Sequence, residues 1–256
     1  MIDADELLSR SKRPLVLGIG GGGDVVGALA TAEACRLHGA EPVVGGVSWE
    51  RRPIDPQPGP RAEAEIEGAR RLAPGVMAAS AGTRVRESGV LFAESRMAEL
   101  LGEETVLVDA TLGPVALADG IAAAAAALGA DLIVFVDVGG DALAHGDEPG
   151  LASPLCDALL LAAAARLAER GAPPVLGGIF GIGCDGELTP PEVLERLAEV
   201  GAAGGLAGAR GLTPAVTARL EEAVKVVPTE ASAQALLCFH GEIGASAIRQ
   251  GRPASG

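Results

Sequence analysis

The chain has 256 residues and a formal net charge of −14, because 34 Asp and Glu residues outnumber 20 Lys and Arg residues. This excess of carboxylates argues against nucleic acid as a partner, since such binding depends on Lys and Arg neutralising phosphates. Hydrophobic residues make up 48% of the chain and aromatic residues only 2%, so Ala, Val and Leu must fill the core.

The cysteine spacing and the hydropathy pattern further narrow the class of protein. The four cysteines lie far apart and form no CxxC pair, which excludes zinc-ribbon and CxxC redox motifs. The N-terminal stretch has no apolar core of the kind that a signal peptide needs. Apolar stretches such as Ile121–Leu128 are too short to span a bilayer. We therefore expect a cytoplasmic protein without a membrane partner.

In the first half of the chain, apolar strands alternate with helical patterns after a short amphipathic lead-in over residues 1–12. Four prolines make Pro53–Pro60 a loop, because proline removes a hydrogen-bond donor that regular structure needs. The other predicted elements are, in chain order, a strand over Leu15–Ile19, a helix over Asp24–His38, a strand over Pro42–Val47, a helix over Arg61–Leu72, a strand over Val76–Ala79, a helix over Phe92–Leu101, a strand over Thr105–Asp109 and a helix over Val115–Leu128.

The second half begins with Asp131–Val136, an uninterrupted apolar run after its first residue, as in a strand buried on both faces. A glycine-rich loop over Gly139–Gly150 follows. The later predicted elements are a helix over Ser153–Arg170, a strand over Pro174–Phe180, a loop over Gly181–Leu188, helices over Pro190–Val200, Thr213–Val224 and Thr229–Phe239, and a frayed end over Arg249–Gly256.

This alternation predicts an α/β fold, with a Rossmann-like, mostly parallel sheet, helices on both faces and a helical C-terminal part. We find no internal repeat and no interdomain linker, so we expect a single domain over residues 1–256. In such sheets, ligands bind at the carboxyl ends of the strands.

The first candidate site is the glycine run after the first strand. Gly18, Gly20 and Gly23 match GxGxxG, and the amides of the following helix would attract an anion. The candidate substrate-binding residues here are Gly20, Gly21, Gly22, Gly23 and Asp24, with Glu50 and Arg51 after the second strand. A glycine turn that serves only packing is the structural alternative.

The second candidate follows the strand Asp131–Val136. Asp137 and Asp141 lie in a flexible turn, and two carboxylates there suit a hydrated Mg²⁺ or acid/base catalysis. His145, Asp147 and Glu148 are further proton carriers. A solvated acidic loop is the alternative.

Two more segments complete the candidate set. Asp185 follows another apolar strand, although Asp185-Gly186 is also a common turn pair. Ser153 and Asp157 begin a helix that leaves the Asp137 loop, which places them near the site. Thr229 and Glu230 begin a helix, where an N-cap and a favourable interaction with the helix dipole are the favoured explanation and a ligand contact is the alternative.

Several motifs in the same order resemble the domain of unknown function 1152 family. They are Gly20-Gly21-Gly22-Gly23-Asp24-Val25-Val26-Gly27-Ala28, Trp49-Glu50-Arg51, Asp137-Val138-Gly139-Gly140-Asp141, Ser153-Pro154-Leu155, Asp185-Gly186-Glu187-Leu188 and Thr229-Glu230-Ala231-Ser232. The resemblance spans nearly the whole chain. It implies one full-length domain and no particular activity.

We expect an enzyme that acts on a small anionic metabolite, a nucleotide or sugar phosphate, as hydrolase, lyase or transferase. Asp137, Asp141, His145 and Asp185 are its candidate catalytic residues, with Asp137 and Asp141 as ligands of Mg²⁺. A dinucleotide-dependent oxidoreductase is one alternative. Against it, Asp24 would repel a pyrophosphate, and Glu50 stands further along the sequence than an acidic residue that binds the ribose hydroxyl normally does. A non-catalytic metabolite sensor is another. The sequence leaves open whether the protein forms a homo-oligomer.

Overall fold

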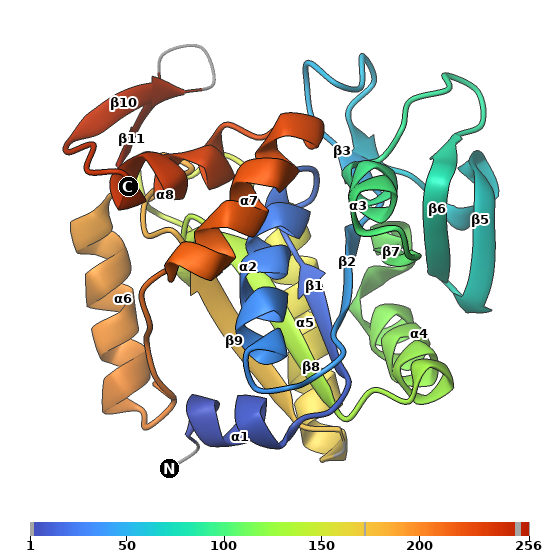
Figure 1. The fold of residues 1–256 in the computed structure, drawn as a ribbon, viewed down its shortest axis with the longest axis horizontal. Helices are drawn as coiled ribbons and strands as arrows, with labels where there is room; N and C mark the ends of the chain where they lie inside the picture. The colour runs from blue at the N-terminus through green and yellow to red at the C-terminus, as the bar shows by residue number, and fades with distance from the viewer. Residues whose placement is uncertain (1–2, 172, 249–251, 256) are drawn as a thin grey trace.

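The computed structural model describes residues 3–171, 173–248 and 252–255 (Figure 1). Within these residues, a seven-stranded sheet has the strand order β5-β6-β7-β2-β1-β8-β9. At one edge, β5 (Ile66–Ala73) and β6 (Val76–Val85) pair antiparallel to each other, and β6 is also antiparallel to its other neighbour, β7. The remaining strands are parallel: β1 (Pro14–Gly18), β2 (Val43–Val47), β7 (Thr105–Val108), β8 (Leu132–Val138) and β9 (Val175–Phe180). The expected mostly parallel sheet is confirmed.

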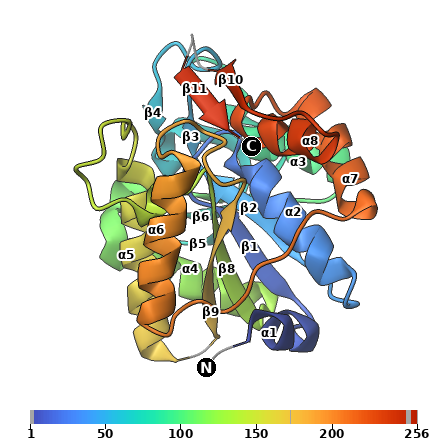
Figure 2. The same cartoon turned by 90° about the vertical axis from the view of Figure 1, so that its left-hand side faces the viewer.

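Helices cover both faces of this sheet (Figure 2). One face carries α4 (Gly113–Leu128) and α5 (Leu155–Arg170), and the other carries α2 (Asp24–Arg36), α3 (Ala93–Leu101) and α7 (Pro214–Val226). The remaining elements are α1 (Ala4–Arg10), α6 (Pro190–Ala202), α8 (Ala231–Phe239), the 3₁₀ turns η1 (Glu63–Glu65), η2 (Ala110–Leu112) and η3 (Asp141–Leu143), and the short strands β3 (Trp49–Glu50), β4 (Gly59–Pro60), β10 (Ala245–Ile248) and β11 (Arg252–Ser255).

The core has two layers because the central strands are buried on both faces. Leu15 and Leu17 of β1 pack toward α4 and α5, whereas Val16 packs toward α2 and α7. Alternate side chains of a strand point to opposite faces, so a doubly covered strand must be apolar throughout. This is why the continuous apolar runs in the sequence predict strands correctly.

The register of the sheet places the ends of β1 and β8 side by side. Gly18 lies opposite Val136 in the parallel pairing of these strands. Asp137 therefore leaves the sheet next to the glycine run that follows Gly18. After β1, the chain winds outward through β2 to β7, and then returns to β8 on the other side of β1. In doubly wound sheets, the crevice at such a reversal is where ligands bind.

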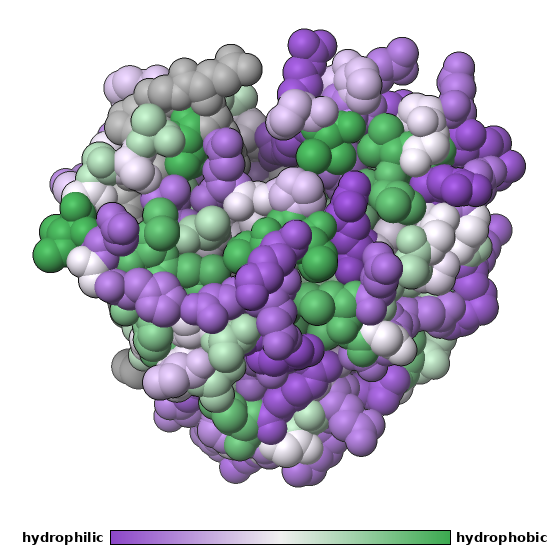
Figure 3. Space-filling model, turned by 45° about the horizontal axis from the view of Figure 1, so that its top comes forward, coloured by the Kyte–Doolittle hydropathy of each residue, from purple (hydrophilic) through white to green (hydrophobic). Residues whose placement is uncertain are grey.

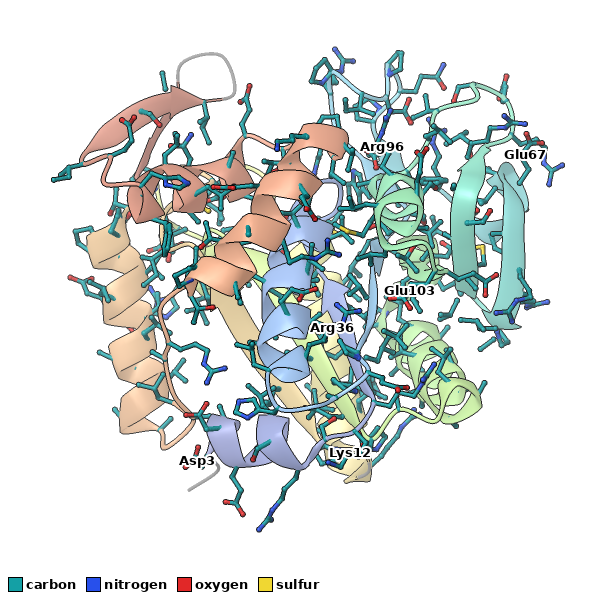
Figure 4. All side chains as sticks on the ribbon, viewed as in Figure 1. Asp3, Lys12, Arg36, Glu67, Arg96 and Glu103 are labelled. Carbon is teal, nitrogen blue, oxygen red and sulfur yellow. The ribbon has the colours of Figure 1, made fainter. Side chains whose placement is uncertain are left out.

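Surface ion pairs lie at the opposite, amino-terminal end of the parallel strands. Arg36 near the end of α2 forms ion pairs with Glu33 at 2.7 Å and with Glu103 at 3.2 Å, the latter just after α3 (Figure 4). The Arg36–Glu103 pair is exposed, and exposed pairs contribute little to stability.

The predicted helix over Arg61–Leu72 is wrong. Residues Ile66–Ala73 form β5, which turns at Pro74-Gly75 into β6. The Ala, Glu and Arg content favours a helix locally, but pairing with β6 decides the structure. The exposed Arg70 and Arg71 suit an edge strand, where charges oppose unwanted pairing.

Two loop predictions also need correction. The last two residues of the predicted loop Pro53–Pro60 form β4, which pairs with β3. Within the predicted frayed end, Arg252–Ser255 pairs with β10 as an antiparallel strand, and the rest of that stretch lies outside the described residues.

One stretch is longer and more apolar than expected. Ala110–Leu128, 19 residues, could cross a membrane by length and composition, which corrects the expectation that such stretches are too short. Its buried residues include Leu117, Ile121 and Ala124, which pack against the sheet with α5. The helix thus forms part of the layer that covers one face of the sheet.

Close strand packing requires glycine at position 45 of β2. A Cβ there would lie 2.4 Å from the carbonyl oxygen of Val106 on β7. We therefore expect Gly45→Ala to lower the free energy of unfolding by about 1–3 kcal/mol, measured by urea denaturation. Gly177→Ala on β9 is the matched control, because no atom lies within 4 Å of a Cβ at that position. It should change stability by at most about 0.5 kcal/mol. Equal effects of the two substitutions would contradict this explanation.

Candidate functional site

Six carboxylates gather at the carboxyl ends of β1, β8 and β9 and form two groups. One carboxylate oxygen from each of Asp24, Asp137 and Asp157 lies within 4.8 Å of the others, and we call these residues the Asp137 triad. The same holds for Asp141, Asp185 and Glu187, the Asp141 triad. The two triads together are the carboxylate cluster.

The cluster lies below the surface. Its six side chains are at most 9% exposed. Figure 3, in which the top of Figure 1 comes forward, shows hydrophilic and hydrophobic side chains interspersed over this end of the molecule. Burial removes the water that normally stabilises a carboxylate, so these groups depend on partners inside the protein.

Asp137 is fixed by the turn that follows β8. Its Oδ2 accepts hydrogen bonds from the amides of Gly140 at 2.9 Å and Ala142 at 3.3 Å. Gly139 and Gly140 adopt φ values of 125° and 112°, which favour glycine. The other oxygen, Oδ1, is buried and has no hydrogen-bond partner among the described residues. Burial, followed by the charges of Asp141 and Asp157, raises the pKa of Asp137 well above its usual range.

Asp157 and Asp141 share this situation. Burial and the charge of Asp24 raise the pKa of Asp157 to about 8, against the opposing effect of Arg51. Within the described part of the chain, Asp157 Oδ1 also lacks a hydrogen-bond partner. Burial and the charge of Asp157 raise the pKa of Asp141 to about 8, while a hydrogen bond with Asp137 lowers it. Without a cation, these carboxyls therefore hold protons at neutral pH.

The loop after β9 brings in the remaining two carboxylates. A Cβ on Gly139 would lie 2.2 Å from the carboxyl carbon of Asp185, so glycine at this position lets Asp185 approach the end of β8. Glu187 accepts hydrogen bonds from the amides of Ala152 at 2.7 Å and Ser153 at 2.8 Å, and from the Ser153 hydroxyl. Ser153 thus positions Glu187 at the start of α5.

The glycine run is packed against protein on several sides. A Cβ on Gly21 would lie 2.8 Å from the Trp49 carbonyl oxygen, and one on Gly23 would lie 2.3 Å from Thr229 Oγ1. The Gly20 amide donates to Asp24 Oδ2 at 2.8 Å. Close packing therefore accounts for glycine at these positions, while a role in anion binding stays a prediction.

Arg51 supplies positive charge beside the cluster. Its guanidinium donates a hydrogen bond to the Gly20 carbonyl oxygen and lies 5.9 Å from the centre of the Trp49 ring. A Cβ on Gly22 would lie 3.4 Å from Arg51 Cγ. Arg51 therefore reaches the glycine run and partly offsets the charge of Asp157, while its role in substrate binding stays a prediction.

Glu50 lies beside this site and supports a helix. Its Oε1 accepts a hydrogen bond from the Ala93 amide, at the start of α3, at 2.6 Å. Burial raises the pKa of Glu50 to about 7, although this hydrogen bond lowers it. Next to it, Glu94 is fully buried and both of its carboxyl oxygens lack hydrogen-bond partners among the described residues. Burial and the charge of Glu50 raise the pKa of Glu94 well above its usual range.

Three predicted residues lie at the margin. His145 is half exposed and its Nε2 lies 2.8 Å from Glu199 Oε2 on α6. Thr229 Oγ1 donates to Ser232 Oγ at 3.2 Å, and Ser232 Oγ donates to the Gly23 carbonyl oxygen at 3.2 Å. Glu230 is the N-cap residue of α8. Thr229 thus contacts the glycine run, while His145 pairs with a surface glutamate.

The sequence prediction of the cluster was incomplete. Asp24, Asp137, Asp141 and Asp185 come together as the strand-end argument requires. The sequence places Asp157 near the site without a role and gives none to Glu187, nor to Glu94 beside Glu50, outside the cluster. A signal for Glu187 existed, because it stands two residues after Asp185. Glu94 resembles an ordinary first-turn acid of a helix, and only the fold shows that it is buried.

The model of one protein family, described as a protein of unknown function (DUF1152), matches residues 15–255. No curated protein and no solved structure matches the chain.

We expect the metal-free protein to lose stability as pH rises from about 5 to 9. Asp141, Asp157 and Glu50 have pKa values of about 8, 8 and 7 in the folded state. The folded protein therefore holds protons that the unfolded chain has released, and this stabilisation disappears as pH rises through these values. Urea denaturation with a chelator present, at one-unit pH steps, measures the effect.

Asp157→Asn should flatten this pH dependence and stabilise the metal-free protein at pH 8 by about 0.5–2 kcal/mol. Asp119→Asn, at an exposed position of α4, is the control and should leave the dependence unchanged. A stability that is constant or rises between pH 5 and 9 would contradict the burial of protonated carboxyls.

Proposed function

The chain belongs to the DUF1152 family of proteins of unknown function, and from its site we propose a divalent-metal-dependent enzyme that acts on a small phosphorylated metabolite. Hydrolysis or group transfer at the phosphate is the reaction class that the site supports best. We place the enzyme in the cytoplasm, without a nucleic-acid or membrane partner.

The observation that carries this proposal is the pair of buried oxygens, Asp137 Oδ1 and Asp157 Oδ1, that lack hydrogen-bond partners among the described residues. Leaving such atoms unpartnered costs free energy, and leaving them ionised costs more. A bound cation removes both costs. The donor set consists of carboxylate oxygens, which are the ligands that Mg²⁺ and Mn²⁺ prefer.

The charge of the cluster favours a phosphate that is bound together with its metal. Six buried carboxylates would repel a free anion. Protein-bound Mg²⁺ commonly uses one or two carboxylates and completes its shell with water and substrate phosphate oxygens. Gly23, the N-cap residue of α2, has no side chain to cap that helix. The guanidinium of Arg51 contacts the glycine run and acts on the charge of Asp157. Both would stabilise a phosphate there.

The contacts give less support to a dinucleotide-dependent oxidoreductase. Glu50, the candidate ribose ligand, holds the start of α3. The Gly20 amide, part of the GxGxxG pattern, is already bonded to Asp24. A non-catalytic sensor would use the same metal and phosphate contacts without turnover, so only an assay separates it from an enzyme.

We expect Mg²⁺ or Mn²⁺ to support turnover of one class in a panel of nucleotides and sugar phosphates, with phosphate release or transfer as the measurement. Asp137→Asn and Asp157→Asn should each lower this activity by about 100-fold or more, the upper end of what losing a supporting residue costs a metal site. Asp119→Asn should leave it unchanged.

Two results would count against the enzyme. Metal-dependent stabilisation by a phosphorylated ligand without any product would assign the chain to the sensor class. Absence of any metal-dependent ligand binding across the panel would overturn the proposal.

A further inference from the structure

We propose that the carboxylate cluster binds two divalent cations, one in each triad, so that the site is a binuclear centre. This inference rests on the proposed metal dependence and specifies its stoichiometry. It also narrows the substrate to a phosphate ester or anhydride held between two cations.

The spacing of the carboxylates suits two separate ions. The ligand oxygens within each triad lie within 4.8 Å of one another, and the triads share no residue. Oxygens on opposite sides of one Mg²⁺ or Ca²⁺ ion are about 4–5 Å apart, given metal–oxygen distances of about 2.0–2.6 Å. Each triad therefore matches one coordination sphere. Asp137 near the end of β8 and Asp141 at the start of η3 are close in the chain, so the turn after β8 carries one ligand of each triad.

The unpartnered oxygens lead to the same conclusion. Asp137 is 1% exposed and Asp157 is 2% exposed, and each has an Oδ1 without a hydrogen-bond partner in the described part of the chain. Both atoms belong to the Asp137 triad, so a cation in that triad would supply the partner that they lack.

A second ion makes the charge compensation more complete. When all six carboxylates are ionised, one divalent cation and Arg51 neutralise only half of their charge. Two cations and Arg51 leave a single negative charge. Because unneutralised buried carboxylates are costly, the second cation would take the place of the protons that otherwise neutralise the second triad.

The Asp141 triad also has the outer support that metal ligands need. Asp185 Oδ1 accepts a hydrogen bond from the Glu187 amide at 3.2 Å. Glu187 is held by the Ala152 and Ser153 amides and by the Ser153 hydroxyl. Such hydrogen bonds orient ligands before the metal binds. Paired cations in phosphatases and nucleases stabilise both the attacking and the leaving oxygen at phosphorus.

The test is to titrate the chelator-treated, full-length protein with Mn²⁺ and to monitor binding by calorimetry and by electron paramagnetic resonance. We expect two Mn²⁺ per chain and a spectrum in which the two ions are spin-coupled. Asp157→Asn and Asp185→Asn should each reduce the stoichiometry to one and restore the six-line spectrum of an isolated ion. Asp119→Asn should retain two coupled ions. Circular dichroism and urea denaturation of each variant establish that it is folded.

The outcomes separate this inference from the proposed function. One Mn²⁺ per chain that is lost in Asp157→Asn and retained in Asp185→Asn would overturn the binuclear centre and leave the metal-dependent enzyme standing. No Mn²⁺ binding would overturn both. Two ions that persist in both variants would lie outside the cluster, and would overturn the assignment as well.

Discussion

The burial of six carboxylates where β1, β8 and β9 end is the constraint on which the rest of this site depends. Ionised carboxylates in a water-excluded position must find hydrogen bonds, protons or cations. Backbone amides supply part of this need, as at Asp137, whose Oδ2 accepts from two amides of the following turn. In the metal-free protein, protons meet the remaining need, because burial and the charges of neighbouring carboxylates raise the pKa values of Asp137, Asp141 and Asp157.

Glycine makes this crowding possible. The carboxylates come from the glycine run after β1, the turn after β8, the start of α5 and the loop after β9. A side chain at Gly20 would meet Asp24, and one at Gly139 would meet Asp185. The glycines therefore shape the site through close approach of protein to protein. Their role is broader than the phosphate turn that GxGxxG suggests, because the run also packs against Trp49 and Thr229.

The electrostatics reconcile a strongly acidic chain with a proposed anionic substrate. A site built from carboxylates attracts cations first, and a phosphate becomes a favourable ligand only when a metal has reversed the local charge. Under this proposal, Arg51 and the start of α2 would contribute to the same reversal from the side of the glycine run. This order of events distinguishes the site from a bare anion cradle, in which backbone amides alone hold the phosphate.

The sequence by itself determined the parallel strands and the acidic residues that follow them. Continuous apolar runs mark strands buried on both faces, and chemistry at their carboxyl ends follows from the winding of parallel strands. This logic places Asp24, Asp137, Asp141 and Asp185 correctly. Only the tertiary structure decided that residues 66–73 form an edge strand, since pairing with β6 outweighs a local helical preference.

The tertiary structure likewise decided which acids are buried. Asp157 and Glu94 each stand in the first turn of a helix, where an exposed acid is common, and their burial depends on neighbours that are distant in sequence. Glu50 reads as a ribose ligand in the sequence, but the position of α3 makes it the acceptor for the Ala93 amide. Local pattern thus fixes where the chain turns, whereas long-range packing fixes which carboxylates lose their water and therefore need a partner.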